Sequence, residues 1–157
     1  MNRKIENIKN YRLYLLGQLD GLSTQQLNAI PAGYSNNLVW NLAHLVSVAQ
    51  NLGYVRAGLP IAVDDRYFSP YLPGTKPERF IDEPEIQTIK ALCITSVDGF
   101  QADYAKNRFG NYSPSAGIRQ VYGVEVSTID EAIDYLLYHE GFHGGYMLSL
   151  KRLLQRL

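Results

Sequence analysis

Apolar residues recur at helical spacing in four stretches of this 157-residue chain. A spacing of three and four residues places side chains on one face of an α-helix. Capping signals support the helix starts: Thr128-x-x-Glu131 is a capping-box pattern, and Pro84 suits a first helical position. We therefore predict four long helices. They run from about Asn2 to Leu22, from Ser35 or Asn36 to about Ala57, from Pro84 (capped by Asp82 or Glu83) past Tyr104, and from Thr128 to the end.

Two segments between these helices lack helical periodicity. Leu59 to Glu83 carries several prolines, and its aromatic residues indicate that it packs against the rest of the protein. Long ordered loops are uncommon in compact domains and are often functional, but the role of this one stays open. Asn107 to Ser127 is predicted to be irregular, with at most a short strand over Arg119 to Val126. A short helical turn is expected after Ser23.

Four amphipathic segments without a confident strand predict an all-α protein, a four-helix bundle. The chain has 46% hydrophobic and 19% charged residues, which is typical of a globular protein rather than a disordered one. Its length fits one domain, so we expect residues 1–157 to form a single bundle.

Charge and hydropathy exclude several classes of partner. Lys+Arg and Asp+Glu both number 15, and no long basic run occurs, so we expect no binding to nucleic acid or to an anionic membrane. No apolar run is long enough to span a bilayer, and no signal peptide opens the chain. We therefore expect a cytoplasmic protein. The single cysteine, Cys93, lies on an apolar helix face and is expected in the core.

The three histidines carry the most specific chemistry. His139 and His143 are four residues apart on the last helix and can bind one ion without bending the backbone, and His44 lies on the second helix. Three imidazoles would leave a coordination position open, as in a catalytic site rather than a closed structural one. We predict a divalent metal at His44, His139 and His143. Zinc, nickel and iron all suit imidazole ligands, so the choice among them stays open.

Two alternative interpretations remain beside this one. His139-Glu140-x-x-His143 matches the zinc protease signature, in which the glutamate is the general base. No His, Asp or Glu follows His143, however, so a downstream third ligand is missing and a peptidase is disfavoured. His44 lies on a polar stripe with Asn37 and Asn41, which is either bundle surface or the wall of a pocket.

At this point the chain resembles the DinB-like superfamily, whose members are small four-helix bundles with a three-histidine metal site. The related groups include bacillithiol-S-transferases and mycothiol-dependent maleylpyruvate isomerases. The resemblance spans nearly the whole chain, and three motifs carry it: Leu22-Ser23-x-x-Gln26-Leu27 followed by Pro31, Leu38-x-Trp40-x-x-x-His44-Leu45, and His139-x-x-x-His143-Gly144. It implies that the three histidines are the metal ligands, that the helices connect up-down-down-up, and that the protein forms a homodimer. The family motif often continues with Arg-Gly-Gln after the second histidine, whereas this chain has Gly144-Gly145-Tyr146, so no substrate is implied.

The function expected from these observations is a metal-dependent transferase that uses a low-molecular-weight thiol on a small-molecule substrate. A bound metal deprotonates a coordinated thiol. Glu140 is a candidate base and Tyr146 a candidate donor to substrate, while Asn41 is a candidate to orient a ligand. The alternatives are a hydrolase that uses metal-activated water and a non-catalytic metal-binding or sensor module.

Overall fold

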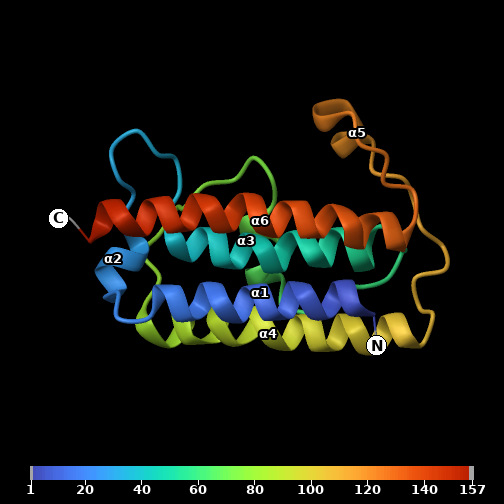
Figure 1. Cartoon of the computed structure of the whole chain (residues 1–157), viewed down its shortest axis with the longest axis horizontal. Helices are drawn as coiled ribbons and strands as arrows, with labels where there is room; N and C mark the ends of the chain where they lie inside the picture. The colour runs from blue at the N-terminus through green and yellow to red at the C-terminus, as the bar shows by residue number, and fades with distance from the viewer. Residues whose placement is uncertain (1, 156–157) are drawn as a thin grey trace.

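The computed structural model describes residues 2–155, and this part of the chain is helical without any strand (Figure 1). The predicted all-α bundle is therefore confirmed. None of the described helices is sufficiently long and apolar to cross a lipid bilayer. The four long helices are α1 (Arg3–Leu19), α3 (Leu38–Gln50), α4 (Glu83–Ala105) and α6 (Ile129–Leu154), and the two shorter α-helices are α2 (Thr24–Asn28) and α5 (Ala116–Tyr122).

The long helices form a square in which α1 and α3 each contact both α4 and α6. Lys4, near the start of α1, pairs with Asp134, near the start of α6, so these two helices are parallel. Lys9 pairs with Asp98 late in α4, so α1 and α4 are antiparallel. Helix α3 contacts α4, and the colours of Figure 1 show that the two run in the same direction. The four long helices thus follow an up-down-down-up order.

Side-chain caps fix where the helices begin. Asp82 accepts a hydrogen bond from the Glu85 backbone N–H and caps α4, which agrees with one of the two predicted caps. Asn37 caps α3 through the Trp40 N–H at 2.8 Å, so that helix begins slightly later than Ser35 or Asn36. An asparagine in extended conformation satisfies an otherwise unpaired N–H group of the first turn.

The predicted second helix changes type before it ends. Regular α-helix stops at Gln50, and Asn51–Val55 continues as a π-helical turn. Gly53 lies in that turn, and a Cβ there would come within 2.7 Å of the Phe100 ring on α4. Gly58 then has a φ of 70°, as expected of a glycine that follows a helix.

The segment before α6 differs from the prediction. Instead of irregular chain or a short strand, it contains α5, which ends where Gly123 takes a left-handed conformation with φ 67°. None of the α5 residues is buried. The helix has only seven residues and none of them is buried, so its sequence carries no apolar stripe from which it could be identified.

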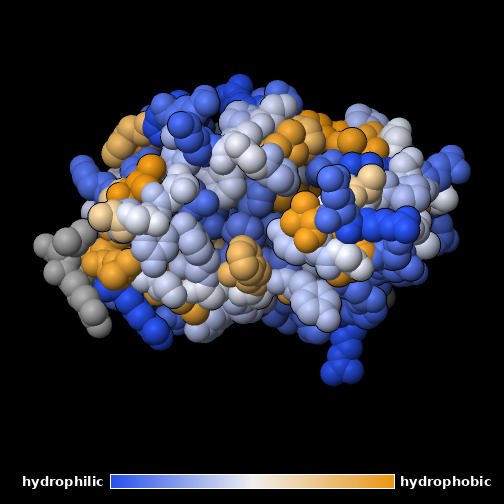
Figure 2. All heavy atoms as spheres, turned by 90° about the horizontal axis from the view of Figure 1, so that it is seen from above, coloured by the Kyte–Doolittle hydropathy of each residue, from blue (hydrophilic) through white to orange (hydrophobic). Residues whose placement is uncertain are grey.

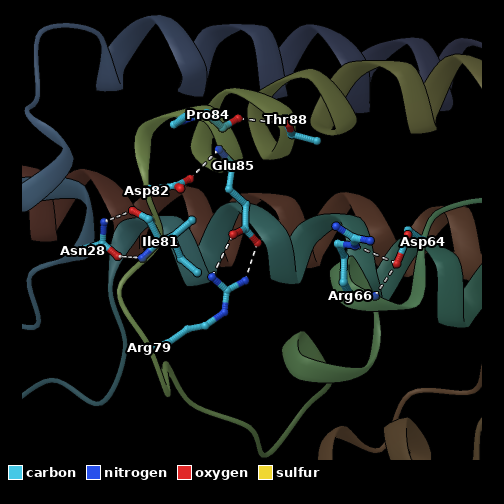
Figure 3. Close-up of polar contacts among 9 residues, drawn as sticks. All are labelled: Asn28, Asp64, Arg66, Arg79, Ile81, Asp82, Pro84, Glu85 and Thr88. Carbon is cyan, nitrogen blue, oxygen red and sulfur yellow. Dashed lines mark hydrogen bonds and ion pairs between the residues drawn. The ribbon is translucent and has the colours of Figure 1, made fainter.

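The long loop before α4 is ordered, as predicted. It contains 3-10 turns at Asp65–Tyr67 and Ser69–Tyr71. Figure 3 shows how it is tied to the bundle: Asn28 exchanges two hydrogen bonds with the Ile81 backbone, at 2.9 and 2.8 Å, and Arg79 pairs with Glu85. These contacts join the loop to α2 and α4, while the 3-10 turns, with the buried ring of Tyr71, lie against α3.

Candidate metal centre

The three histidines meet inside the bundle. His44 comes from α3, and His139 and His143 come from α6. One ring nitrogen from each lies within 4.8 Å of those of the other two. The two Nε2 atoms of His44 and His139 are 3.3 Å apart. The structure thus brings together all three predicted ligands, which are called the histidine cluster below.

His44 is held on its outer side by the long loop. Its Nδ1 lies 2.6 Å from the Tyr71 carbonyl oxygen, and its ring stacks on Trp40 with centroids 4.5 Å apart. A carbonyl oxygen can only accept, so Nδ1 carries the proton and Nε2 of the neutral ring keeps its lone pair. That lone pair faces the cluster.

His143 is oriented in the same way by a side chain. Its Nδ1 lies 2.8 Å from Asn41 Oδ1, while the Asn41 amide donates to Asn36 Oδ1 and to the Asn37 carbonyl. Because the Asn41 nitrogen is occupied as a donor, Oδ1 is the acceptor and His143 donates from Nδ1. Nε2 of His143 is then free to bind. Asn41 is fully buried, so the polar stripe of α3 forms a wall of the site and not bundle surface.

His139 is the least constrained of the three. Among residues 2–155, its buried Nδ1 has no hydrogen-bond partner, and its Nε2 faces that of His44. The Tyr135 ring lies beside it, with centroids 6.2 Å apart. A neutral His139 must either leave an Nδ1 proton unpaired or direct its Nε2 proton at His44. If an ion binds both Nε2 atoms, His139 carries its proton on Nδ1, and no proton is directed at His44.

Burial keeps the cluster uncharged. It lowers the pKa of His139 to about 2, with further contributions from His143 and His44, and lowers that of His143 to about 4. Burial also lowers the pKa of His44, although its contact with Tyr71 opposes this. All three imidazoles are therefore neutral at neutral pH, and neutral imidazole is the form that binds metals.

Glu140 does not lie beside the histidine lone pairs. It is 1% exposed, in contrast to the solvent-exposed position usual for a residue next to a ligand. Its Oε1 accepts from Arg12 Nε at 3.0 Å and Arg12 Nη2 at 2.5 Å. Burial raises the pKa of Glu140, and Arg12 opposes that rise. The carboxylate is thus directed at α1, whereas the histidines of the same helix face α3.

Tyr146 lies one turn beyond His143 on α6 and is partly buried. Its ring makes an edge contact with Tyr34, with centroids 5.4 Å apart. Burial raises the pKa of its hydroxyl, which is therefore protonated at neutral pH and able to donate. Tyr34, in the loop before α3, was not expected near the site.

Aromatic side chains of α6 lie beside two of the histidines, Phe142 against His143 and Tyr135 against His139. Phe142 is 71% exposed and its ring contacts that of His143 edge-on, while Tyr138 is 79% exposed. On the other side, Tyr122 of α5 contacts Tyr135. Figure 2 shows the molecule from above Figure 1, with apolar patches scattered among polar surface. The surroundings of the cluster therefore suit an organic molecule with an apolar part.

A separate cavity of about 450 Å³ lies beneath the long loop. It is lined by Tyr71, whose carbonyl contacts His44 Nδ1, and by Trp40, which stacks on the face of the His44 ring. None of the three histidines lines this cavity. It is therefore not the space in front of the Nε2 atoms.

Sequence reasoning missed two groups that support the cluster. The Tyr71 carbonyl is a backbone atom of a loop, and no side-chain pattern announces it. Arg12 did leave a signal, because it interrupts the apolar stripe between Ile8 and Leu15 of the first helix. A charge at a core position of a helix predicts a buried partner.

The comparisons with known proteins agree with this geometry. No curated protein matches the chain. The sequence model described as the DinB superfamily matches residues 11–147, which covers most of the chain and includes all three histidines. The chain therefore belongs to the DinB superfamily.

Proposed function

We propose that this protein is a metal-dependent transferase that uses a low-molecular-weight thiol, with one divalent ion held by His44, His139 and His143. The observation that carries the proposal is the histidine cluster itself: three neutral ring nitrogens within 4.8 Å of one another, on two facing helices. Three protein ligands leave room for a further ligand, which is typical of catalytic rather than structural metal sites.

The residues present fit such an ion. Tyr71 and Asn41 accept hydrogen bonds from Nδ1 of His44 and His143, so the Nε2 lone pairs of these two histidines are available to an ion. Outer contacts of this kind fix the tautomer and orientation of metal-binding histidines. Zinc, nickel and iron all accept imidazole nitrogen. When bound, the ion would supply the positive charge that lowers the pKa of a small thiol.

The chain itself provides no reactive thiol for a transfer reaction. Cys93 is its single cysteine, and burial raises the pKa of that thiol to about 12. A protonated thiol is a poor nucleophile, because the thiolate is the reactive form. The nucleophile is therefore proposed to be an external small thiol.

The surrounding side chains are assigned to substrate binding. Tyr146 is proposed to donate its hydroxyl proton in a hydrogen bond to the substrate, and Tyr138 and Phe142 to contact an apolar part of it. Glu140 is assigned no proton transfer, because Arg12 already binds its carboxylate in the core. The same exposed aromatic side chains would also suit contact with a second copy of the chain, so the homodimer stays a prediction.

Metal content tests the first half of the proposal. Wild type, His44→Ala and Ser47→Ala are purified identically, and their metal is measured by elemental analysis. Ser47 lies one turn from His44 on α3, is also buried and, like His44, bonds to a carbonyl of the long loop, so Ser47→Ala is a control for losing such a bond without losing a ligand. We expect about one ion per chain in wild type and Ser47→Ala, and a sharp loss in His44→Ala. Equal metal in all three proteins would refute the site.

A thiol-transfer assay tests the second half. Metal-loaded protein is incubated with a chlorinated aromatic acceptor and a panel of small thiols, with Cys93→Ser as control. Transfer that requires both metal and thiol and persists in Cys93→Ser supports the proposal. Metal-dependent hydrolysis without any thiol would favour the hydrolase, and metal binding without turnover would favour a binding or sensor module.

A further inference from the structure

Arg12 connects the four long helices from the centre of the bundle. It belongs to α1 and is 1% exposed. Its guanidinium donates to Glu140 on α6, to the Cys93 carbonyl on α4 at 3.2 Å, and to the Leu45 carbonyl on α3 at 2.7 Å. One side chain therefore binds each of the other three long helices.

The partners of Arg12 and its neighbour Tyr11 adjoin the histidine cluster in sequence. Leu45 follows His44, and Glu140 follows His139. Gly144 follows His143, and it leaves the space that the Tyr11 ring occupies, since a Cβ there would overlap that ring. Two consecutive residues of α1 thus contact the residue that comes directly after each of the three histidines.

Stability alone does not account for this arrangement. A buried Arg–Glu pair loses hydration that its attraction only partly offsets, and an apolar pair of similar volume is often as stable. An apolar pair, however, does not fix direction. The guanidinium presents its N–H groups in a rigid plane, so its three partners are held at set positions along and around their helices.

We propose that Arg12 and Glu140 are positioning residues for the histidine cluster. Their contacts set the rotation and the sliding of α6 relative to α3, so that His139 meets His44. This inference rests on the proposed metal site, because positioning is defined here by the affinity and geometry of the bound ion. The unpaired Nδ1 of His139 supports it: that ring has no hydrogen-bond anchor of its own among residues 2–155, so its position depends on its helix.

The test replaces both charges at once. Arg12→Met combined with Glu140→Met leaves no unpaired buried charge and nearly preserves volume. The matched control is Lys4→Ala with Asp134→Ala, which removes an ion pair between the same two helices at half-exposed positions. For each protein, urea unfolding of the metal-free form gives stability, and titration with Co²⁺ gives the dissociation constant and the visible d–d spectrum.

We expect the Arg12/Glu140 double variant to fold and to bind Co²⁺ at least about tenfold more weakly, with a changed d–d spectrum, an effect comparable to the loss of groups that hydrogen-bond to metal-binding histidines. The Lys4/Asp134 control should have the same Co²⁺ dissociation constant and the same d–d spectrum as wild type. An unchanged dissociation constant and spectrum in a folded double variant would overturn the proposal. If that variant does not fold, Arg12→Lys replaces it: lysine keeps the charge opposite Glu140 but lacks the planar guanidinium that reaches all three helices, so the expectation and the overturning result stay the same. A wild type that fails to bind Co²⁺ would instead refute the metal site itself.

Discussion

Asn41 and His143 join α3 to α6 through a hydrogen bond of 2.8 Å between Asn41 Oδ1 and His143 Nδ1. Both residues face the interior, and Asn41 is fully buried. The bond matters because it decides which nitrogen of His143 keeps its lone pair. With Nδ1 protonated, Nε2 is available to an ion shared with His44 and His139.

Asn41→Ala should therefore weaken metal binding without removing a ligand. The Nδ1–H group of His143 would lose its acceptor, and the ring would be free to rotate. We expect the metal dissociation constant to rise by about 10- to 100-fold, the usual range for outer contacts of metal-binding histidines. Competition with a chromophoric chelator measures this. Asn41→Asp keeps an acceptor at the same place and should retain most of the affinity; equal loss in both variants would show that the acceptor is not what matters.

The metal-free protein should lose stability as the pH falls below 6.5. In the folded protein, burial lowers the pKa of all three histidines below the ordinary value of 6.5, to about 4 for His143 and about 2 for His139. Between 6.5 and 4 the unfolded chain takes up protons that the folded chain does not, so unfolding becomes more favourable. Above pH 6.5 neither state binds these protons and the contribution is constant.

Urea midpoints of chelator-treated protein at pH 8, 6 and 5 would measure this decline. His139→Gln is the matched control, because it removes the ring with the lowest pKa and should flatten the dependence. Comparing the two proteins separates the histidines from Glu140, whose raised pKa acts in the opposite direction. Identical pH dependence in both proteins would contradict the assignment.

The metal should not be required for folding. The core is built from apolar faces of the four long helices, including Leu15, Leu42, Ile89 and Leu150, and it does not depend on the cluster. This distinguishes the chain from zinc fingers, whose folding free energy is largely metal-binding free energy. Circular dichroism at 222 nm should retain most of its amplitude after chelation, and a collapse of that signal would contradict the prediction.

The sequence revealed the bundle and its three histidines because both follow periodic rules. The helix caps at Ser23, Asp82 and Thr128 are local signals that act within four residues, and the structure contains all three. His139 and His143 share a face for the same geometric reason. These features needed no knowledge of distant contacts.

Other parts of the site depend on distant contacts and escaped sequence reasoning. The anchor of His44 is a carbonyl of the loop, placed there by 3-10 turns and by the bonds between Asn28 and Ile81. Glu140 was a candidate base from its place beside His139, but Arg12 pairs with its carboxylate inside the core. The pattern of residues along the chain does not identify which charged residues pair with one another in the folded protein.

Cys93 should resist alkylation in the native protein. It is fully buried on α4, its pKa is raised to about 12 by burial, and its Sγ lies 3.6 Å from the Leu42 carbonyl. Thiolate is the reactive form, and almost none exists at pH 8. Mass spectrometry after iodoacetamide treatment should show an unmodified native protein and complete modification in 6 M guanidinium. Rapid alkylation of the folded protein would mean that the α3–α4 contact opens readily.

Gly144 and Gly145 are neighbours on α6, yet alanine should have opposite effects at the two positions. Among the described residues, a Cβ at Gly144 would meet the Tyr11 ring, whereas a Cβ at Gly141 or Gly145 would meet nothing within 4 Å. Alanine at position 145 should stabilise the helix by about 0.5–1 kcal/mol, because glycine is that much less favourable in a helix interior. At position 144 the same methyl group must displace Tyr11, and overpacking of this kind costs about 1–3 kcal/mol.

Urea unfolding of Gly144→Ala and Gly145→Ala, each against wild type, gives both free energies. In a Tyr11→Ala background, Gly144→Ala should cost less than it does in wild type, since the ring that the methyl group meets is gone. If Gly144→Ala is as stable as Gly145→Ala, α1 and α6 are not packed as closely as the structure shows.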